Sequence, residues 1–169
     1  MKLSTISVFA AAVTLIALLA TGSLAWAAET SVQLVNPGFE DAIEGWSTWY
    51  ARQPTNASTV DGPTGQCLQA LGESGSRVVI SQAFEAQPQA WYTLRYRFNA
   101  APNGPSGGAM GYCRVSFADP NGKFIDYPNT KPLLDTFGQW VEAEQTFKTP
   151  LSIGEVTIGF NQSGAADLR

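Results

Sequence analysis

Short apolar runs separated by turn residues dominate this sequence, and no long segment has the apolar spacing of a helix. Clusters such as Asp119-Pro120-Asn121-Gly122 combine the residues that favour tight turns. This punctuation predicts an all-β domain, with a short helical turn over 37–43 left open. The expected strands cover residues 32–35, 46–51, 67–71, 77–84, 91–99, 111–118, 139–148 and 155–161. We interpret their spacing as that of a β-sandwich, with a mobile loop over the Gly/Pro/Ser-rich residues 102–108.

The first 27 residues differ from the rest of the chain and predict a secretory signal. Lys2 gives a positive start, residues 6–20 are almost wholly apolar, and Ala25-Trp26-Ala27 places small residues where a signal peptidase reads. The apolar run is too short and wrongly flanked for a stable membrane span. We therefore expect cleavage after Ala27, one mature domain over residues 28–169, and a secreted or cell-surface location with no membrane contact after cleavage.

Charge and cysteine usage narrow the classes of function. A net charge of −4 without charge runs argues against nucleic acid or an anionic membrane surface as a partner. The chain has no histidine, so it lacks the usual metal ligand and the base of Ser-His or Cys-His pairs. Cys67 and Cys113 could form one disulfide in an oxidising compartment. Cys113 shares a strand face with Val115 and Phe117. Cys67 is out of phase with Leu68, so a disulfide and two free thiols both stay open.

The most specific signal lies near the start of the expected mature chain. Residues 34–40 read LVNPGFE, and Gly45-Trp46 follows a short polar loop. Asn, Pro and Gly in succession supply turn chemistry. The stretch resembles the opening of the jelly-roll carbohydrate-binding modules of families 4, 9, 16 and 22, which are attached to many secreted glycosidases. Later pieces resemble the same modules in the same order, namely VISQ at 79–82, WYTL at 91–94, GQW at 138–140 and FKTP at 147–150.

This resemblance implies a galactose-binding-like jelly roll, which is a β-sandwich of two antiparallel sheets, from about Leu34 to the last residue. It implies binding of a polysaccharide or oligosaccharide with no cofactor required. It also implies a structural calcium with Glu40 as one ligand, and the alternative is a solvent-facing acidic turn. Such modules usually close with a further strand after a run like the ADLR at 166–169. We interpret the chain as a piece of a longer protein, and a fold that lacks this strand is the alternative.

Strand alternation separates the predicted core from a predicted ligand surface. On residues 91–99 the outward set contains Arg95, Arg97 and Asn99, and on 111–118 it contains Tyr112 and Arg114. If the two strands share one sheet, these side chains form one face. Guanidinium groups there would bind hydroxyls or carboxylates, and a ring would stack on a sugar. The alternative is a solvated sheet face whose arginine stems cover apolar surface.

A tryptophan completes the predicted binding surface. Trp49 is out of phase with Trp46, so one of the two should face outward. The resemblance places Trp46 in the core, which leaves Trp49 as the exposed stacking platform. Gln82 is in phase with the apolar Ile80 and Phe84, so we expect it to be buried and hydrogen-bonded to a nearby strand end.

Together these patterns predict a secreted, non-catalytic module that holds an enzyme or a cell surface near a polysaccharide. Two alternatives stay open. One is a structural or adhesive surface domain of the same fold without sugar affinity, and the other is the N-terminal module of a longer glycoside hydrolase. Catalysis within these residues is not expected, because Glu142 and Glu144 alternate with apolar residues as on an ordinary exposed face. A catalytic domain in a longer parent chain is the further partner considered.

Overall fold

The computed structural model describes residues 14–18, 30–51, 55–63, 65–72, 77–102, 110–163 and 166–169. Within these ranges every regular element is a β-strand, and no helix that could cross a membrane is found. The strands are β1 (Thr14–Leu18), β2 (Thr30–Val32), β3 (Ser47–Ala51), β4 (Thr55–Gly62), β5 (Gly65–Gly72), β6 (Arg77–Glu85), β7 (Trp91–Phe98), β8 (Ala100–Pro102), β9 (Gly111–Ala118), β10 (Phe124–Leu133), β11 (Val141–Lys148), β12 (Glu155–Ser163) and β13 (Ala166–Leu168).

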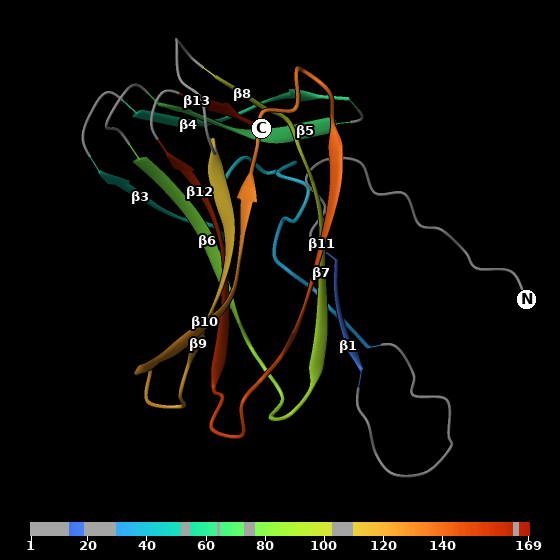
Figure 1. The fold of residues 1–169 in the computed structure, drawn as a ribbon, viewed down its shortest axis with the longest axis vertical. Helices are drawn as coiled ribbons and strands as arrows, with labels where there is room; N and C mark the ends of the chain where they lie inside the picture. Colours follow the sequence, from blue (N-terminus) through green and yellow to red (C-terminus); the bar gives the residue numbers. More distant parts are fainter. Residues whose placement is uncertain are drawn as a thin grey trace, which may run out of the picture.

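Two sheets face each other and a third lies across one end (Figure 1). The β7 sheet has the strand order β11-β7-β1-β2, and the β9 sheet has the order β10-β9-β12-β6-β3. The end sheet, with the order β4-β5-β13-β8, runs across the top of both in Figure 1. Neighbouring strands pair in antiparallel fashion, as on the long β12–β6 and β11–β7 ladders. The predicted jelly-roll β-sandwich is confirmed, and the end sheet is an addition to the two sheets expected.

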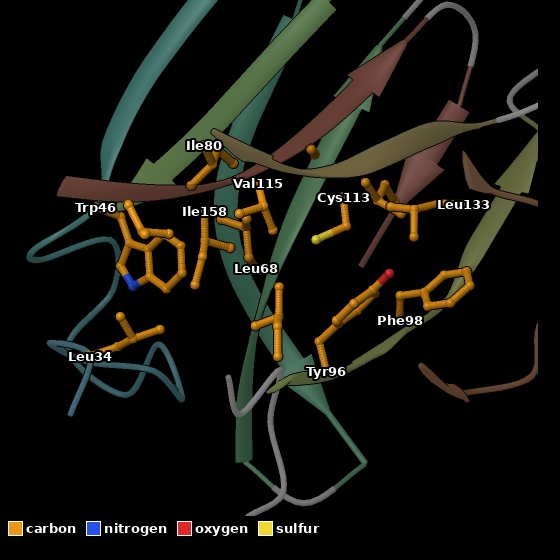
Figure 2. Close-up of a cluster of buried hydrophobic side chains, with 14 of the residues drawn as sticks. Leu34, Trp46, Leu68, Ile80, Tyr96, Phe98, Cys113, Val115, Leu133 and Ile158 are labelled. Carbon is orange, nitrogen blue, oxygen red and sulfur yellow. The ribbon is translucent and has the colours of Figure 1, made fainter. Parts of the chain in front are cut away.

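The core fills the space between the two large sheets. Alternate residues of β7, namely Tyr92, Leu94, Tyr96 and Phe98, are buried, and so are Cys113, Val115 and Phe117 of β9. Figure 2 shows this cluster extending from Leu34 and Trp46 at one side to Phe98 and Leu133 at the other. Each fully buried large apolar side chain contributes about 1.5–3 kcal/mol, so reversing the inward face of either strand is prohibitively costly. The inward faces predicted for both strands are confirmed.

A polar cluster sits within this core. The amide nitrogen of Gln145 donates to the Tyr96 hydroxyl at 3.0 Å. Burial raises the pKa of the Cys113 thiol to about 12, against hydrogen bonds to Tyr96 and Gln145 that lower it. Burial likewise raises the pKa of Tyr96 above its usual range. Both groups therefore stay protonated wherever the fold is intact at moderate pH.

The opening motif forms a tight loop that is fastened to β6. Asn36 adopts a positive φ of 46°, and its side-chain nitrogen donates to the Ala42 carbonyl at 2.9 Å. Trp46 is 6% exposed, packs 5.0 Å from the Phe39 ring, and donates its indole N–H to the Asn36 carbonyl. Gln82 is 7% exposed and bonds to the backbone of this loop. The predictions of a core Trp46 and a buried, bonded Gln82 are both confirmed.

Strand β1 falls inside the segment predicted to be a signal. It lies between β7 and β2, with Leu15 opposite Leu94 on one side and Val32 on the other. Strand β2 pairs only with β1 among the described strands. Cleavage after Ala27 stays a prediction, and it would take β1 out of the β7 sheet. At the other end of the chain, the backbone of Arg169 exchanges two hydrogen bonds of 2.7 Å with Asn99.

The sequence-based strand boundaries need correction at several places. Strand β11 begins at Val141, two residues after the predicted start, and only Val32 of the predicted strand 32–35 lies in a strand. Strands β1, β4, β8, β10 and β13 were not expected. Residues 37–43 form turns and no helix. Most of the predicted loop at 102–108 lies outside the described residues. Cys67 and Cys113 are both buried free thiols, so the candidate disulfide is absent. Cys67 belongs to β5 of the end sheet and Cys113 to the inward face of β9, which separates them by layer.

Candidate functional site

The predicted six-residue surface does not exist as one face. Strand β7 belongs to one large sheet and β9 to the other, so their outward side chains point away from each other on opposite layers. Arg95, Arg97 and Asn99 therefore cannot share a site with Tyr112 and Arg114. The assumption that the two strands are neighbours in one sheet was wrong.

The outward side chains of β7 are occupied by contacts within the domain. The Arg95 Nε atom lies 2.7 Å from the Glu144 carboxylate, and the Arg97 Nε atom lies 3.8 Å from that of Glu142. Both pairs join directly opposite positions on β7 and β11. The Asn99 side chain donates to the Gly138 carbonyl at 3.0 Å. Exposed pairs of this kind contribute at most about 1 kcal/mol each, so this face is an ordinary cross-strand ladder of charges.

The outward face of the β9 sheet has a different character. Register places Trp49 opposite Val79, Val79 opposite Asn161, and Asn161 opposite Tyr112, in one row across β3, β6, β12 and β9. Trp49 is 55% exposed, which confirms the outward orientation predicted for it. The row thus places two aromatic residues on the same outer face, with the two strands β6 and β12 between them.

Two arginines fill the spaces between the rings of this face. The guanidinium carbon of Arg77 lies 6.0 Å from the Trp49 ring centre and 5.9 Å from that of Tyr112. That of Arg114 lies 5.6 Å from Tyr112 and 4.6 Å from Tyr127. We call these five residues, Trp49, Arg77, Tyr112, Arg114 and Tyr127, the strip. Cation–π contacts at such distances fix the guanidinium groups in place at about 0.5–1 kcal/mol each.

The two arginines of the strip form no ion pair with an acidic side chain among the described residues. A terminal nitrogen of Arg77 donates to the Asn161 side-chain oxygen at 2.8 Å, and Asn161 itself is 2% exposed. The Nε atoms of Arg77 and Arg114 are buried without a hydrogen bond, since rings cover them. Within the described part of the chain, neither arginine has a carboxylate at ion-pair distance.

Small side chains form the surface beside the strip. Gly159 of β12 lies opposite Ser81 of β6 and Arg114 of β9, and Ser47 of β3 lies opposite Ser81. A Cβ atom added at Gly159 would meet the Ser81 Cβ at 3.7 Å, an ordinary contact distance. Gly159 is itself buried, and an added Cβ would also meet the Asn161 side chain at 3.6 Å, so neighbouring side chains already cover β12 at this point.

A small apolar pocket lies between the end sheet and the core, lined by residues such as Leu68, Phe98, Leu133 and Leu168. Its lining offers almost no polar groups, whereas a sugar needs hydrogen-bond partners for its hydroxyls. The outer faces of the sheets are therefore the better candidates for a saccharide site.

The residues around Glu40 do not fit the predicted calcium site. The Glu40 carboxylate accepts the Gln66 N–H at 3.3 Å, and the Asn36 carbonyl accepts the Trp46 indole N–H at 3.0 Å. The Asn36 side-chain oxygen accepts the Asp41 N–H. Within the described residues, no group of three or more histidine, cysteine or acidic side chains could hold a metal. The ligand set is incomplete, and calcium at Glu40 stays a prediction.

Three aromatic or cationic residues of this face were missed in the sequence. Arg77 is out of phase with the apolar Val78 and Ile80 and therefore outward, a signal that was available. The rings of Phe124 and Tyr127 pack at a tilt of 44°, with centroids 4.5 Å apart, on β10, an edge strand interrupted by bulges and two prolines. Prolines are confined to edge strands or bulges, so the segment did not have the pattern of a strand.

Comparisons with known proteins agree with this fold. No protein-family model matches the sequence, and a search of curated proteins found no match. Among solved structures, the enzymatically active domain of bacteriophage CBA120 tailspike protein 4 superposes with a TM-score of 0.61 at 14% identity. That match covers 78% of this chain and 19% of the other, so this chain spans about a fifth of the tailspike structure.

Two structures of similar size are carbohydrate-binding modules. A family 16 module gives a TM-score of 0.53 at 20% identity, with 80% of this chain and 92% of the other covered. A family 61 module in complex with β-1,4-galactotriose gives 0.53 at 13% identity, with 79% and 88% covered. The chain has the fold of these carbohydrate-binding modules. A third match, to the family 22 module and catalytic domain of Clostridium thermocellum xylanase Xyn10B with xylohexaose, gives 0.52 at 17% identity over 77% of this chain and 25% of the other.

Proposed function

We propose that this module binds a polysaccharide, without catalysis, on the outer face of the β9 sheet. The observation that carries the proposal is the strip, in which the exposed rings of Trp49 and Tyr127 and the partly buried ring of Tyr112 alternate with two guanidinium groups. Aromatic rings stack on the C–H faces of sugars, and guanidinium groups donate forked hydrogen bonds to neighbouring oxygens. The sugar rings of the ligand would lie on Trp49 and Tyr127, with Tyr112 between them holding the two arginines.

The opposite outer face supports this assignment by contrast. On β7 and β11 the arginines are neutralised by glutamates directly across the ladder. Both faces carry one exposed tryptophan, Trp49 on β3 and Trp91 on β7, but only Trp49 belongs to a row of rings and arginines without carboxylate partners among the described residues. The names of the similar structures, carbohydrate-binding modules with galactotriose or xylohexaose bound, also support a saccharide ligand.

The module would act outside the cell and concentrate an enzyme or a surface at its substrate. Binding of this kind raises the local concentration of a tethered partner and needs no chemistry of its own. Secretion by the N-terminal 27 residues and a catalytic domain in a longer parent chain belong to this proposal.

Affinity electrophoresis through gels that contain plant or algal polysaccharides tests the proposed function. Trp49→Ala and Tyr112→Ala should abolish most of the retardation that the wild-type protein shows. Trp91→Ala is the matched control, because Trp91 is 46% exposed but lies on β7 of the other sheet. Circular dichroism would establish that each variant is folded. A folded wild-type protein that no polysaccharide retards, or strip variants that bind as well as wild type, would refute the proposal and favour an adhesive or structural domain.

A further inference from the structure

The outward arginines of the two large sheets have different neighbours. Arg95 and Arg97 each face a glutamate of β11 within 4 Å. Arg77 and Arg114 lie between aromatic rings, with no described carboxylate at ion-pair distance. An ion pair cancels charge, whereas a ring holds a guanidinium in position and leaves its charge available to a ligand.

The positive charge of the strip is local, although the whole chain carries a net charge of −4. The acidic pair Glu85 and Glu155 sits at the far end of the same outer face, where Glu155 lies opposite Ala118. Ala118 is four residues from Arg114 along β9, which is roughly 14 Å at about 3.4 Å per residue. That separation exceeds the screening length of about 8 Å at physiological salt. The distant carboxylates therefore neutralise the strip only weakly.

The acidic residue closest to the strip along β10 is engaged by its own neighbour. The carboxylate of Asp126 accepts the backbone N–H of Tyr127 at 2.7 Å. Arg114 contacts the ring of Tyr127, and no ion pair joins it to Asp126 within the described residues. A partly desolvated cation without a counter-charge gains the most from an anion supplied by the ligand.

We propose that Arg77 and Arg114 select an acidic polysaccharide, one whose sugar rings carry carboxylate groups. This inference rests on the proposed function and concerns the same face. Both guanidinium carbons lie within 6 Å of the Tyr112 ring centre, on the approach to one central ring. The exposed rings on either side are Trp49, 6.0 Å from Arg77, and Tyr127, 4.6 Å from Arg114. A uronic acid unit that stacks on either ring brings its carboxylate, which projects from the edge of the sugar ring, within reach of the guanidinium beside it.

The test compares acidic polysaccharides with the same polymers after chemical reduction of their carboxyl groups. Reduction keeps the linkage and ring geometry and removes only the charge. Polygalacturonate, alginate and glucuronoxylan serve as probes, each beside its reduced form, with a sulfated carrageenan as a separate arm. The wild-type protein should bind at least one acidic form about tenfold more tightly than its reduced form, which equals about 1.4 kcal/mol. Raising NaCl from about 0.05 M to about 0.5 M should weaken the binding of the acidic form only.

Variants connect this preference to the two arginines. Arg77→Gln and Arg114→Gln should each remove most of the difference between the acidic and reduced forms, and Arg114→Lys should restore part of it. Arg95→Gln is the matched control on the other sheet and should leave the preference unchanged. Equal binding of acidic and reduced forms would overturn the inference and leave the proposed function standing. Preference for carrageenan over every carboxylated probe would also overturn it, and binding to no polysaccharide at all would end both proposals.

Discussion

Replacing Gln82 with methionine tests how the opening loop is held to the sandwich. The Gln82 side chain makes three hydrogen bonds to the loop backbone. It accepts the Val35 N–H at 2.9 Å and donates to the carbonyls of Val35 at 3.0 Å and Gly45 at 2.7 Å. Methionine has nearly the same volume and fits an apolar neighbourhood, so the substitution removes the bonds without opening a cavity.

The expected loss follows from these three bonds. A typical intramolecular hydrogen bond contributes about 1 kcal/mol net, which gives about 3 kcal/mol for the set. The side chain of Val35 and the whole of Gly45 are exposed, so the released backbone groups regain some hydration. Burial of the apolar methionine offsets a further part. We therefore expect the free energy of unfolding to fall by about 2–3 kcal/mol, a large share of the 5–15 kcal/mol typical of a domain.

Urea unfolding followed by tryptophan fluorescence measures this loss, since Trp46 lies in the same loop. Gln66→Met is the control, because Gln66 bonds to the exposed Asp61 and its loss should cost less than about 0.5 kcal/mol. A Gln82→Met protein within about 1 kcal/mol of wild type, with an unchanged m-value, would refute the idea that Gln82 fastens the loop.

Four further predictions follow from the sheet faces and the core. Gly159→Leu should lower polysaccharide affinity at least tenfold by gel retardation and also cost about 1–3 kcal/mol in urea unfolding, because Gly159 is buried and the new side chain must displace its neighbours; wild-type affinity would show that the ligand does not cross β12. Glu144→Gln should lower the free energy of unfolding in urea by less than about 1 kcal/mol and leave binding intact, since its partner Arg95 is exposed; a larger loss would mean that the ion pairs between β7 and β11 stabilise the fold. Stability should fall from pH 9 to 12, by up to about 1.4 kcal/mol per pH unit, because the unfolded Cys113 thiol ionises near 9 and the folded one only near 12; an equally steep fall in Cys113→Ala would assign the effect to other groups. A protein that begins at Ala28 should stay monomeric by sedimentation and unfold cooperatively, because the proposed secretion removes residues 1–27; self-association or a strong loss of stability would contradict cleavage and make β1 a lasting neighbour of β7 along Trp91–Arg95.

Strand alternation predicted which side chains face inward, and it did so because burial enforces it. A one-residue slip on β7 would expose Tyr92 and Leu94 and bury Arg95, so the sequence must specify the inward face. The same alternation placed Gln82 among apolar neighbours and showed that one of Trp46 and Trp49 faces outward, while the resemblance to the binding modules chose Trp46 for the core. Each of these inferences depends on one strand alone, which is why a sequence sufficed.

The partner of each strand was not predictable in the same way. Alternation on β7 and β9 is satisfied whether the strands are neighbours in one sheet or face each other across the core, and the long connection between them gives no preference. The predicted residues therefore divide between two faces, with Trp49, Tyr112 and Arg114 on one and Arg95, Arg97 and Asn99 on the other, and which of them bind a ligand stays a prediction. The sequence did contain one indication of the observed pairing of β7 with β11. Glu142 and Glu144 have the same two-residue spacing as Arg95 and Arg97, which they face across the ladder.

The backbone pairing of Arg169 with Asn99 has a practical consequence for protein engineering. Strand β13 pairs with β8, from Ala166 opposite Pro102 to Leu168 opposite Ala100. The Ala100 carbonyl accepts the Thr136 N–H from the other side, which is the side of β11. A peptide fused after Arg169 would therefore continue along the edge of β7 that does not pair with β11, toward the positions where Thr14–Leu18 pairs with β7. An affinity tag fused there should be short, hydrophilic and rich in glycine, so that it extends into solvent and does not compete with β1 for pairing with β7.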